Sequence, residues 1–305
     1  MKLSNKYLVS IIIPTKNAGL VFNKVLKSIF NQTIKDFEVI IIDSGSTDKT
    51  LDIAALYPVI IVKIKPEEFG HGKTRNHGVS IASGKFIVFL THDAIPADIE
   101  WLNKLLEPFK NEKIAGVFGR QLPKENDDIT DKFFYHSLYP DQNILWKRNQ
   151  FTQGDNIFSS VNSAIRSELI LKYPFPQNII VSEDYKWAAE ILDKNYHIFY
   201  SKEAAVIHSN CYGNLKYLFR RNFDIGISYK SIYKSKQAAN LLNKGLMIHF
   251  NQIKFLIKNS YYRAVPKAIL KDIIRFIAIS IGKQEQIIPT IIKKSFLSDQ
   301  GWYWI

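Results

Sequence analysis

Short apolar runs alternate with helix-like apolar spacing along the first third of the chain. Apolar runs bounded by polar residues are typical of buried strands, and apolar residues three or four apart are typical of helices. The expected strands are 9–13, 37–42, 59–64 and 86–90, and the expected helices are 18–31, 73–82, 97–109 and a short one containing Leu51. This alternation predicts an α/β fold with a mostly parallel sheet flanked by helices on both faces.

The pattern is less regular in the second half of the chain. Residues 120–155 are polar and aromatic without a clear period, which predicts a loop-rich insertion or a lid. The remaining expected elements are a strand over 115–119, a helix over 185–192 with Ser182 as its N-cap, and edge strands over 196–200 and 204–208.

The net charge of +13 is concentrated in the last third of the chain. Between Tyr212 and Lys294 there are 16 Lys and Arg against 3 Asp and Glu, whereas the other residues carry 25 of each. We therefore expect a neutral domain over 1–211 and a basic, helical region over 212–305. A charge asymmetry of this kind indicates a partner and says little about the fold.

An amphipathic pattern is clearest in the segment 268–281. One helical face carries Ile269, Leu270, Ile273, Ile274, Ile277 and Ile281, while Lys267, Lys271 and Arg275 recur on the other. Segments of this type lie on anionic membrane surfaces. The alternatives are the solvated face of a helical bundle, or a nucleic-acid contact, which is disfavoured because no nucleic-acid module is visible. Trp302, Tyr303 and Trp304 are either interfacial anchors or a docked tail.

Further sequence features bear on the cellular location. Cys211 is the only cysteine, so no intrachain disulfide can form, which fits a reducing compartment. There is no signal-peptide pattern and no run of 18 or more apolar residues that would span a membrane. We expect a cytoplasmic protein, peripheral on the inner face of the cell membrane.

Two acidic segments carry the candidate chemistry. Asp93 follows the expected strand 86–90, at the place where open α/β sheets bind ligands, and Asp184 lies in a second acidic segment. One carboxylate that holds a metal and one that accepts a proton would suit a transferase that uses a nucleotide diphosphate. Such a reaction needs a divalent cation on the diphosphate and a base for the acceptor hydroxyl.

Each candidate residue also has a structural interpretation. Asp93 is either a metal ligand or a helix cap, and His208 is either a further ligand or a structural histidine. Asp184 is either the base or an acid favoured by a helix dipole. Asp43 either contacts a nucleotide or closes an Asx turn, and Arg75 either contacts the diphosphate or lies on a helix surface. None of these signals is specific alone.

The order of the motifs resembles that of family 2 glycosyltransferases over roughly residues 8–210. These are inverting enzymes with the GT-A fold. The matching segments are 12–17 (IIPTKN), 28–33 (SIFNQT), 37–48 (FEVIIIDSGSTD), 75–78 (RNHG), 91–96 (THDAIP) and 182–184 (SED). Jointly this pattern is highly specific.

The resemblance implies a set of site residues. Asp184 would be the general base, Asp93 and His208 would hold manganese or magnesium, and Glu183 and Trp187 would lie on the acceptor side. The residues expected to contact the nucleotide sugar are Pro14, Thr15, Asn17, Asp43, Arg75, Thr91, His92 and Asp93.

One departure from the family pattern points to a donor. The family usually has an aspartate two residues before the metal-binding one, and Thr91 stands there. Together with the segments 69–76 (FGHGKTRN) and 119–123 (GRQLP), this resembles the rhamnosyltransferase branch. The resemblance implies transfer of L-rhamnose from dTDP-L-rhamnose to a saccharide or lipid-linked saccharide of a bacterial surface polysaccharide.

Proteins with other functions would be expected to carry different residues and motifs. A family member using a UDP- or GDP-sugar remains open, whereas a non-catalytic nucleotide-sugar-binding protein would not need to keep Asp184. A nucleotidyltransferase or a dinucleotide oxidoreductase needs a glycine-rich phosphate loop near the first strand, and residues 9–20 contain only Gly19.

Overall fold

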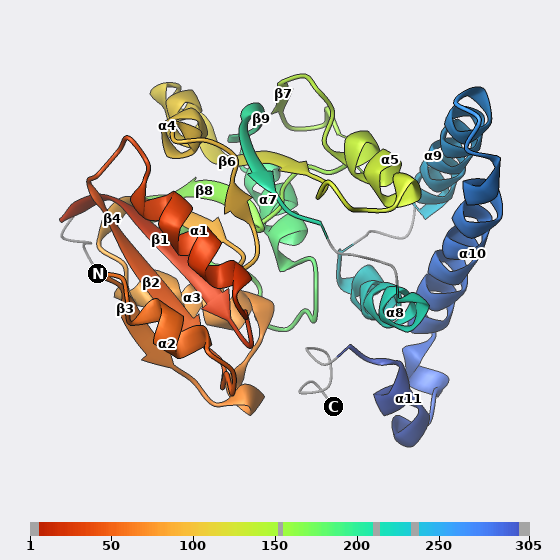
Figure 1. Cartoon of the computed structure of the whole chain (residues 1–305), viewed down its shortest axis with the longest axis horizontal. Helices are drawn as coiled ribbons and strands as arrows, with labels where there is room; N and C mark the ends of the chain where they lie inside the picture. Colours follow the sequence, from red (N-terminus) through yellow and green to blue (C-terminus); the bar gives the residue numbers. More distant parts are fainter. Residues whose placement is uncertain (1–5, 152–154, 210–213, 233–237, 299–305) are drawn as a thin grey trace.

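A nine-stranded mixed sheet forms the body of the protein, and a group of helices follows it in the chain (Figure 1). The computed structural model describes residues 6–151, 155–209, 214–232 and 238–298. The strands are β1 Tyr7–Thr15, β2 Phe37–Asp43, β3 Ile60–Lys63, β4 Gly84–Leu90, β5 Ile95–Pro96, β6 Ile114–Leu122, β7 Ile144–Trp146, β8 Asn162–Arg166 and β9 His197–Ile207. The α-helices are α1 Val21–Phe30, α2 Thr50–Ala54, α3 His71–Ile81, α4 Trp101–Leu106, α5 Ile129–Leu138, α6 Ser167–Lys172, α7 Glu183–Asp193, α8 Leu215–Ile232, α9 Ala238–Lys258, α10 Val265–Gly282 and α11 Thr290–Phe296.

The first four strands form the parallel part of the sheet. The strand order is β3-β2-β1-β4-β8-β6-β9-β5, and β2–β3, β1–β2 and β1–β4 are all parallel pairs. The sheet becomes mixed beyond β4, because β8 runs antiparallel to both β4 and β6, while β6 and β9 are parallel. Thr15 pairs with Asp43 at the carboxyl ends of β1 and β2, which places the residues that follow these strands at one edge.

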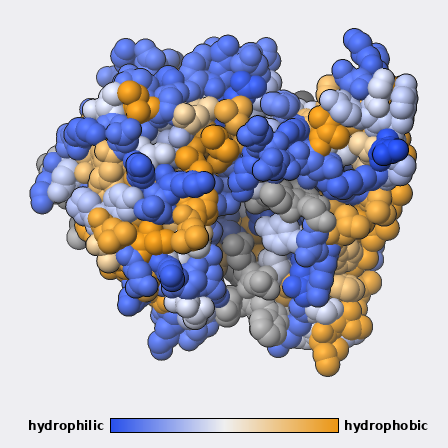
Figure 2. Space-filling view, in the orientation of Figure 1, coloured by the Kyte–Doolittle hydropathy of each residue, from blue (hydrophilic) through white to orange (hydrophobic). Residues whose placement is uncertain are grey.

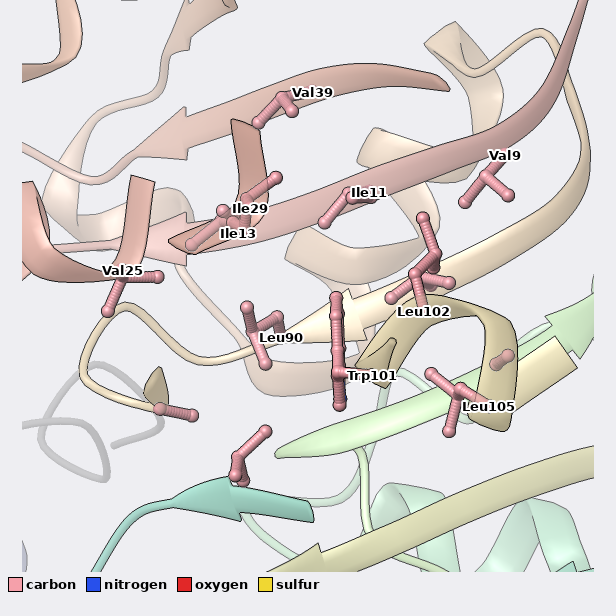
Figure 3. Packing of buried hydrophobic residues seen from close by; sticks show 14 of the residues in the cluster. Val9, Ile11, Ile13, Val25, Ile29, Val39, Leu90, Trp101, Leu102 and Leu105 are labelled. Atoms are coloured by element: carbon pink, nitrogen blue, oxygen red, sulfur yellow. The ribbon is translucent and has the colours of Figure 1, made fainter. Parts of the chain in front are cut away.

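The core lies on both faces of the sheet. Side chains alternate along β1, so that Val9, Ile11 and Ile13 join one buried cluster and Ile12 joins the other. In the first cluster they pack with residues of α1 and α4, including Trp101 (Figure 3). Each fully buried aliphatic side chain of this kind contributes about 1.5–3 kcal/mol. Burial on both faces explains the near-continuous apolar runs of the strands.

The second half is more regular than its sequence pattern indicates. The expected loop-rich insertion over 120–155 contains the end of β6, helix α5 and strand β7. The two expected edge strands are one strand, β9, which pairs with β5, β6 and β7. Strand β8, between β4 and β6, was not expected from the apolar pattern. Ser182 stands at the N-cap position of α7 but makes no side-chain cap bond, because its backbone is left-handed with φ of 68°.

The C-terminal region is helical, and α10 lies against α8. The two backbones approach closely at Gly226 and Gly282. A Cβ atom on Gly282 would lie 2.3 Å from the carbonyl oxygen of Phe223, so only glycine fits there. Cys211, Trp302, Tyr303 and Trp304 lie outside the described residues.

Two of the three basic side chains of α10, those of Lys271 and Arg275, are largely buried against the protein, which the sequence pattern did not predict, whereas that of Lys267 is 46% exposed. The Lys271 side chain is 1% exposed, and its Nζ donates to Asp131 on α5 at 2.8 Å. Lys267 pairs with Asp128 at 2.8 Å, just before α5, and Arg275 lies over the ring of Phe134. These partners come from a distant part of the chain, so the pattern of α10 alone could not reveal them.

Instead, apolar side chains face outward along the C-terminal helices. Figure 2 shows hydrophobic residues gathered on the side of the molecule where α10 and α11 lie. We call this surface the apolar C-terminal face; its exposed residues are Leu246, Met247, Phe250 and Ile257 on α9, Ile269, Leu270, Ile273, Phe276 and Ile277 on α10, and Ile291 and Ile292 on α11. Within the described residues, no helix is both long and apolar enough to cross a membrane.

The two lysine contacts of α10 should contribute very differently to the free energy of unfolding. We expect Lys271→Ala to lower the free energy of unfolding by about 3–5 kcal/mol, because it leaves the Asp131 carboxylate buried without its partner. Lys267→Ala is the matched control, with a 46% exposed side chain and an expected cost of at most about 1 kcal/mol. Urea denaturation measures both values. Equal losses in the two variants would contradict the buried contact.

Candidate active site

The carboxyl ends of β1 and β2 form the first part of the site. Asp43 accepts hydrogen bonds from the backbone N–H groups of Gly45 and Ser46, both at 3.1 Å, and thus closes the turn after β2. Its Oδ1 also lies 3.4 Å from Thr15 Oγ1. Ser46 Oγ also donates to Oδ1 at 2.5 Å, so donors of the protein itself occupy all of the roughly four acceptor positions of this carboxylate. The Asx-turn interpretation is therefore correct, and it leaves Asp43 and Thr15 side by side.

The loops after β1 and β2 hold each other in place. Asn17 has φ of 49° in the left-handed region that asparagine tolerates, and its Oδ1 accepts from the N–H of Thr47 at 2.8 Å. The N–H of Asn17 donates to Ser46 Oγ at 2.9 Å. His92 Nδ1 lies 3.4 Å from the carbonyl oxygen of Pro14, which brings the segment after β4 to the same edge.

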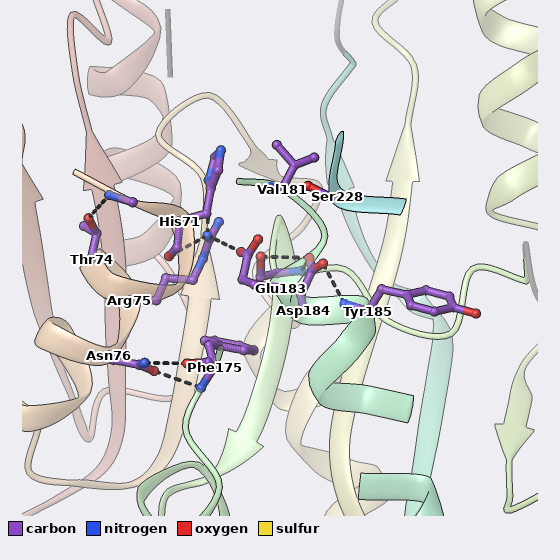
Figure 4. A network of polar contacts seen from close by, with 12 residues as sticks. His71, Thr74, Arg75, Asn76, Phe175, Val181, Glu183, Asp184, Tyr185 and Ser228 are labelled. Carbon is purple, nitrogen blue, oxygen red and sulfur yellow. Dashed lines mark hydrogen bonds and ion pairs between the residues drawn. The ribbon is translucent and has the colours of Figure 1, made fainter. Parts of the chain in front are cut away.

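Arg75 and Glu183 form a buried contact between α3 and α7, which is an ion pair when Glu183 is ionised (Figure 4). Arg75 Nη1 donates to Glu183 Oε1 at 2.8 Å, and the two side chains are 6% and 4% exposed. Burial raises the pKa of the Glu183 carboxyl to about 7; the neighbouring Asp184 carboxylate adds to this rise and the Arg75 guanidinium opposes it. The structure thus joins a residue expected at the nucleotide to one expected at the acceptor.

Asp184 lies in the first turn of α7 and is only partly buried. Its Oδ2 accepts from the backbone N–H of Ser160 at 2.8 Å and from Ser160 Oγ at 3.0 Å, while Oδ1 accepts from the N–H of Tyr185 at 2.8 Å. Three donors fix the orientation of this carboxylate. The position of Asp184 also agrees with a purely structural role, because a helix dipole favours an acidic side chain in the first turn.

Asp93 and His208 face each other beyond the ends of β4 and β9. His208 Nε2 lies 3.5 Å from Asp93 Oδ1, and the side chains are 4% and 29% exposed. Burial lowers the pKa of the His208 imidazole, which favours the neutral ring. On its other side His208 Nδ1 lies 2.9 Å from Gln121 Oε1. An imidazole nitrogen and a carboxylate oxygen that converge are a suitable ligand pair for a divalent cation.

A three-residue turn before β8 connects these parts. Ser159 Oγ accepts from Gln121 Nε2 at 3.0 Å, and Ser160 holds Asp184 as described above. The carbonyl oxygen of Val161 accepts from the N–H of Thr91 at 3.1 Å, two residues before Asp93. Thr91 Oγ1 is buried and has no hydrogen-bond partner within the described residues, so it can receive a ligand. Both acidic segments are therefore attached to residues 159–161.

The structure does not bring every expected residue to the site surface. Trp187 is 1% exposed and packs in the core against Phe158 and Phe175, so its expected contact with the acceptor is wrong. Sequence reasoning also missed the serines of the turn and gave Gln121 no role, although Gln121 belongs to the segment 119–123. A Ser-Ser pair before a short strand carries no chemical signal of its own.

Solved structures with a similar fold define the class of protein. The mannosyltransferase PcManGT from Pyrobaculum calidifontis, solved with GDP-Man and Mn²⁺, is 17% identical with a TM-score of 0.58, covering 98% of this chain and 85% of that one. TarS residues 1–349 from S. aureus, solved with UDP-GlcNAc, is 18% identical with a TM-score of 0.54, covering 80% and 72%. At this identity the likeness concerns the fold, and the expected GT-A fold is confirmed.

Sequence comparison then identifies the family. A family model described as Glycosyl transferase family 2 matches residues 10–172. The O-antigen chain rhamnosyltransferase WbaN of Salmonella anatum is 32% identical over 287 residues, covering 92% of this chain and 90% of its own length. RfbN of Salmonella typhimurium, which has the same description, is 32% identical over 291 residues, covering 92% and 91%. The chain belongs to glycosyltransferase family 2, as its motifs indicated.

The raised pKa of Glu183 predicts a pH-dependent stability. The folded protein keeps a proton on Glu183 up to about pH 7, whereas the unfolded chain releases it near the ordinary value of 4.5. Stability therefore falls as pH rises through this window, by up to about 3 kcal/mol. We expect Glu183→Gln to lack this part of the decrease between pH 5 and pH 8.

Urea denaturation at several pH values measures this difference. Glu190→Gln, on the exposed side of the same helix, is the control and should follow the wild-type pH profile. If the Glu183→Gln profile also runs parallel to the wild type, Glu183 does not titrate in this range.

Proposed function

We propose that this glycosyltransferase moves L-rhamnose from dTDP-L-rhamnose to a hydroxyl of a saccharide or lipid-linked saccharide, with inversion at the anomeric carbon, in the synthesis of a bacterial surface polysaccharide. The similarity to two O-antigen chain rhamnosyltransferases over 92% of this chain supports the donor and the pathway class. The observation that carries the mechanism is the attachment of the two acidic segments to one turn, residues 159–161.

Asp184 is the general base of this proposal. It accepts the proton of the acceptor hydroxyl, and the oxygen then attacks the anomeric carbon from the face opposite the diphosphate. Ser160 and the N–H of Tyr185 hold the carboxylate in one orientation, so little reorganisation is needed in the transition state. Base catalysis of this kind contributes roughly 10²–10⁴-fold to the rate.

Asp93 and His208 would hold a divalent cation, manganese or magnesium. Among the residues that the structure describes, no group of three acidic, histidine or cysteine side chains converges. The remaining ligands would therefore come from the donor diphosphate and from water, as is usual where a cation binds substrate phosphates. When bound, the cation neutralises the charge that develops on the departing diphosphate.

The nucleotide would lie along the carboxyl edge of β1 and β2. Thr15 and Asp43 stand side by side there, and the loop of Asn17 is fixed by the loop after β2. Thr91 Oγ1, which is buried without a partner, adds a contact where the family usually has an aspartate. Arg75, which Glu183 keeps in place, would contact the nucleotide from α3.

The enzyme would work at the inner face of the cell membrane, with the apolar C-terminal face in contact with lipid. Burial of apolar surface contributes about 25 cal/mol per Å². Lys254, Lys258 and Arg263 are exposed on α9 and in the connection to α10, and each adds up to about 1 kcal/mol near an anionic leaflet. This arrangement differs from the sequence-based expectation, because apolar side chains supply the contact and basic groups assist it.

The base role predicts a specific kinetic defect. We expect Asp184→Asn to keep its affinity for dTDP-rhamnose in the presence of Mn²⁺ but to lower turnover about 10²–10⁴-fold, because the proton acceptor is lost. Slow donor hydrolysis, with water as the acceptor, measures turnover, and calorimetry measures affinity. Asp193→Asn, at the exposed end of the same helix, is the matched control.

Near wild-type turnover in Asp184→Asn would remove Asp184 from the base role. The same assay with UDP-glucose, UDP-galactose and GDP-mannose tests the donor. Faster turnover of one of these sugars than of dTDP-rhamnose would contradict the rhamnosyl assignment and leave the base assignment intact.

Membrane binding should depend on the apolar C-terminal face. We expect Ile273→Ser combined with Phe276→Ser to abolish co-flotation with vesicles of phosphatidylglycerol and phosphatidylethanolamine, because two side chains that are 49% and 59% exposed no longer enter the lipid. Leu20→Ser combined with Leu56→Ser removes two apolar groups that are even more exposed, at 77% and 76%, from the catalytic domain and is the control. Unchanged flotation of the α10 variant would instead favour a solvated helical bundle.

A further inference from the structure

Gln121 lies at the end of β6, and the oxygen and nitrogen of its buried side-chain amide contact different partners. It is 3% exposed, and the strand pairing shifts register between Gly119 and Gln121, which is the kind of irregularity that re-aims a side chain. Its Oε1 lies 2.9 Å from His208 Nδ1. Its Nε2 donates to Tyr139 Oη at 2.5 Å and to Ser159 Oγ at 3.0 Å.

The backbone brings these residues together. The N–H of His208 donates to the carbonyl oxygen of Leu122 at 2.9 Å, so the ladder between β6 and β9 continues past Ile207 and sets Gln121 beside His208. Tyr139 belongs to the segment after α5 and is itself buried. The amide is thus held by one neighbour from each of three separate segments.

The contact with Gln121 bears on which nitrogen of the His208 imidazole carries the proton. A neutral imidazole carries one N–H, and an amide oxygen can only accept. If Gln121 Oε1 accepts from Nδ1–H, then Nε2 carries the lone pair, and this is the nitrogen 3.5 Å from Asp93 Oδ1. Histidine ligands of metals usually donate their other N–H in this way, and the acceptor fixes the ring and its tautomer.

We propose that Gln121 is a positioning residue for the cation site: its amide oxygen fixes the tautomer of His208, so that Nε2 presents a lone pair beside the Asp93 carboxylate. The proposal rests on the cation site of the proposed function. Tyr139 and Ser159 complete the arrangement, because they accept the two amide N–H groups when the oxygen is turned toward His208.

The opposite amide orientation makes a different prediction. With the amide turned over, its NH₂ group would donate to Nδ1, and Nε2–H would donate to Asp93 in an ordinary hydrogen bond. His208 would then be a structural partner of Asp93 with no lone pair for a cation. The two arrangements differ in the orientation of the amide and in which ring nitrogen carries the proton, so the tautomer of His208 decides between them.

Long-range ¹H–¹⁵N correlation on protein labelled at histidine reads that tautomer without any metal. His208→Gln identifies the His208 signals by their loss. We expect the Nδ1–H tautomer in the wild type and a shift toward Nε2–H in Gln121→Leu. An Nε2–H tautomer in the wild type overturns the proposal, and this result needs no variant of Gln121 to fold.

Mn²⁺ affinity gives the second readout, measured by electron paramagnetic resonance of free Mn²⁺ with dTDP present. We expect Gln121→Leu to weaken Mn²⁺ binding about 10–100-fold, and Gln121→Glu, which keeps an acceptor for Nδ1–H, to recover most of this loss. Gln252→Leu is the matched control, because Gln252 is also 3% exposed but binds the carbonyl oxygen of Thr130 away from the site.

The Mn²⁺ measurements test the role of Gln121 separately from the cation site itself. If Gln121→Leu binds Mn²⁺ like the wild type while Asp93→Asn and His208→Ala do not bind it, the role of Gln121 is wrong and the cation site stands. If all three variants bind like the wild type, the cation lies elsewhere and that part of the proposed function fails.

Discussion

The arrangement of the site depends on one short turn, residues 159–161. Ser159 accepts a hydrogen bond from the Gln121 amide that contacts His208. Ser160 donates to the carboxylate of Asp184, and Val161 accepts from the segment that carries Asp93. The segments that bear the two carboxylates are far apart in the chain, and neither strand geometry nor helix geometry alone would set their separation. Hydrogen bonds from a rigid turn fix both with little freedom, and such preorganisation is what transition-state stabilisation requires.

Burial explains the other charged contacts around the site. Arg75 and Glu183 are almost fully enclosed, and Lys271 is enclosed with Asp131. Loss of one partner from a buried pair costs several kcal/mol, so these contacts specify geometry more than they add stability. The first pair links α3 to α7, and the second docks α10 on α5. This docking turns the apolar side chains of α10 outward and creates the apolar C-terminal face.

Much of the fold could be predicted because the parallel strands are buried on both faces and appear as apolar runs, as in β1 and β4. The motif order identified the family. Strand β8 and the continuity of β9 could not be predicted, because antiparallel pairing depends on partners distant in sequence. The same limit explains why the pattern did not predict the burial of Lys271 against Asp131, or that of Trp187 against Phe158 and Phe175. The polar partners Gln121, Ser159 and Ser160 have no sequence signal of their own.

Cleavage of the backbone by bound iron is the most direct test of a shared site on this turn. Fe²⁺ in place of the proposed cation, with dTDP, ascorbate and peroxide, cuts the chain only near the metal. The account predicts cuts near Asp93 and His208 and also within residues 159–161, all of them lost in Asp93→Asn. Cuts that spare residues 159–161, or that persist without Asp93, would contradict it.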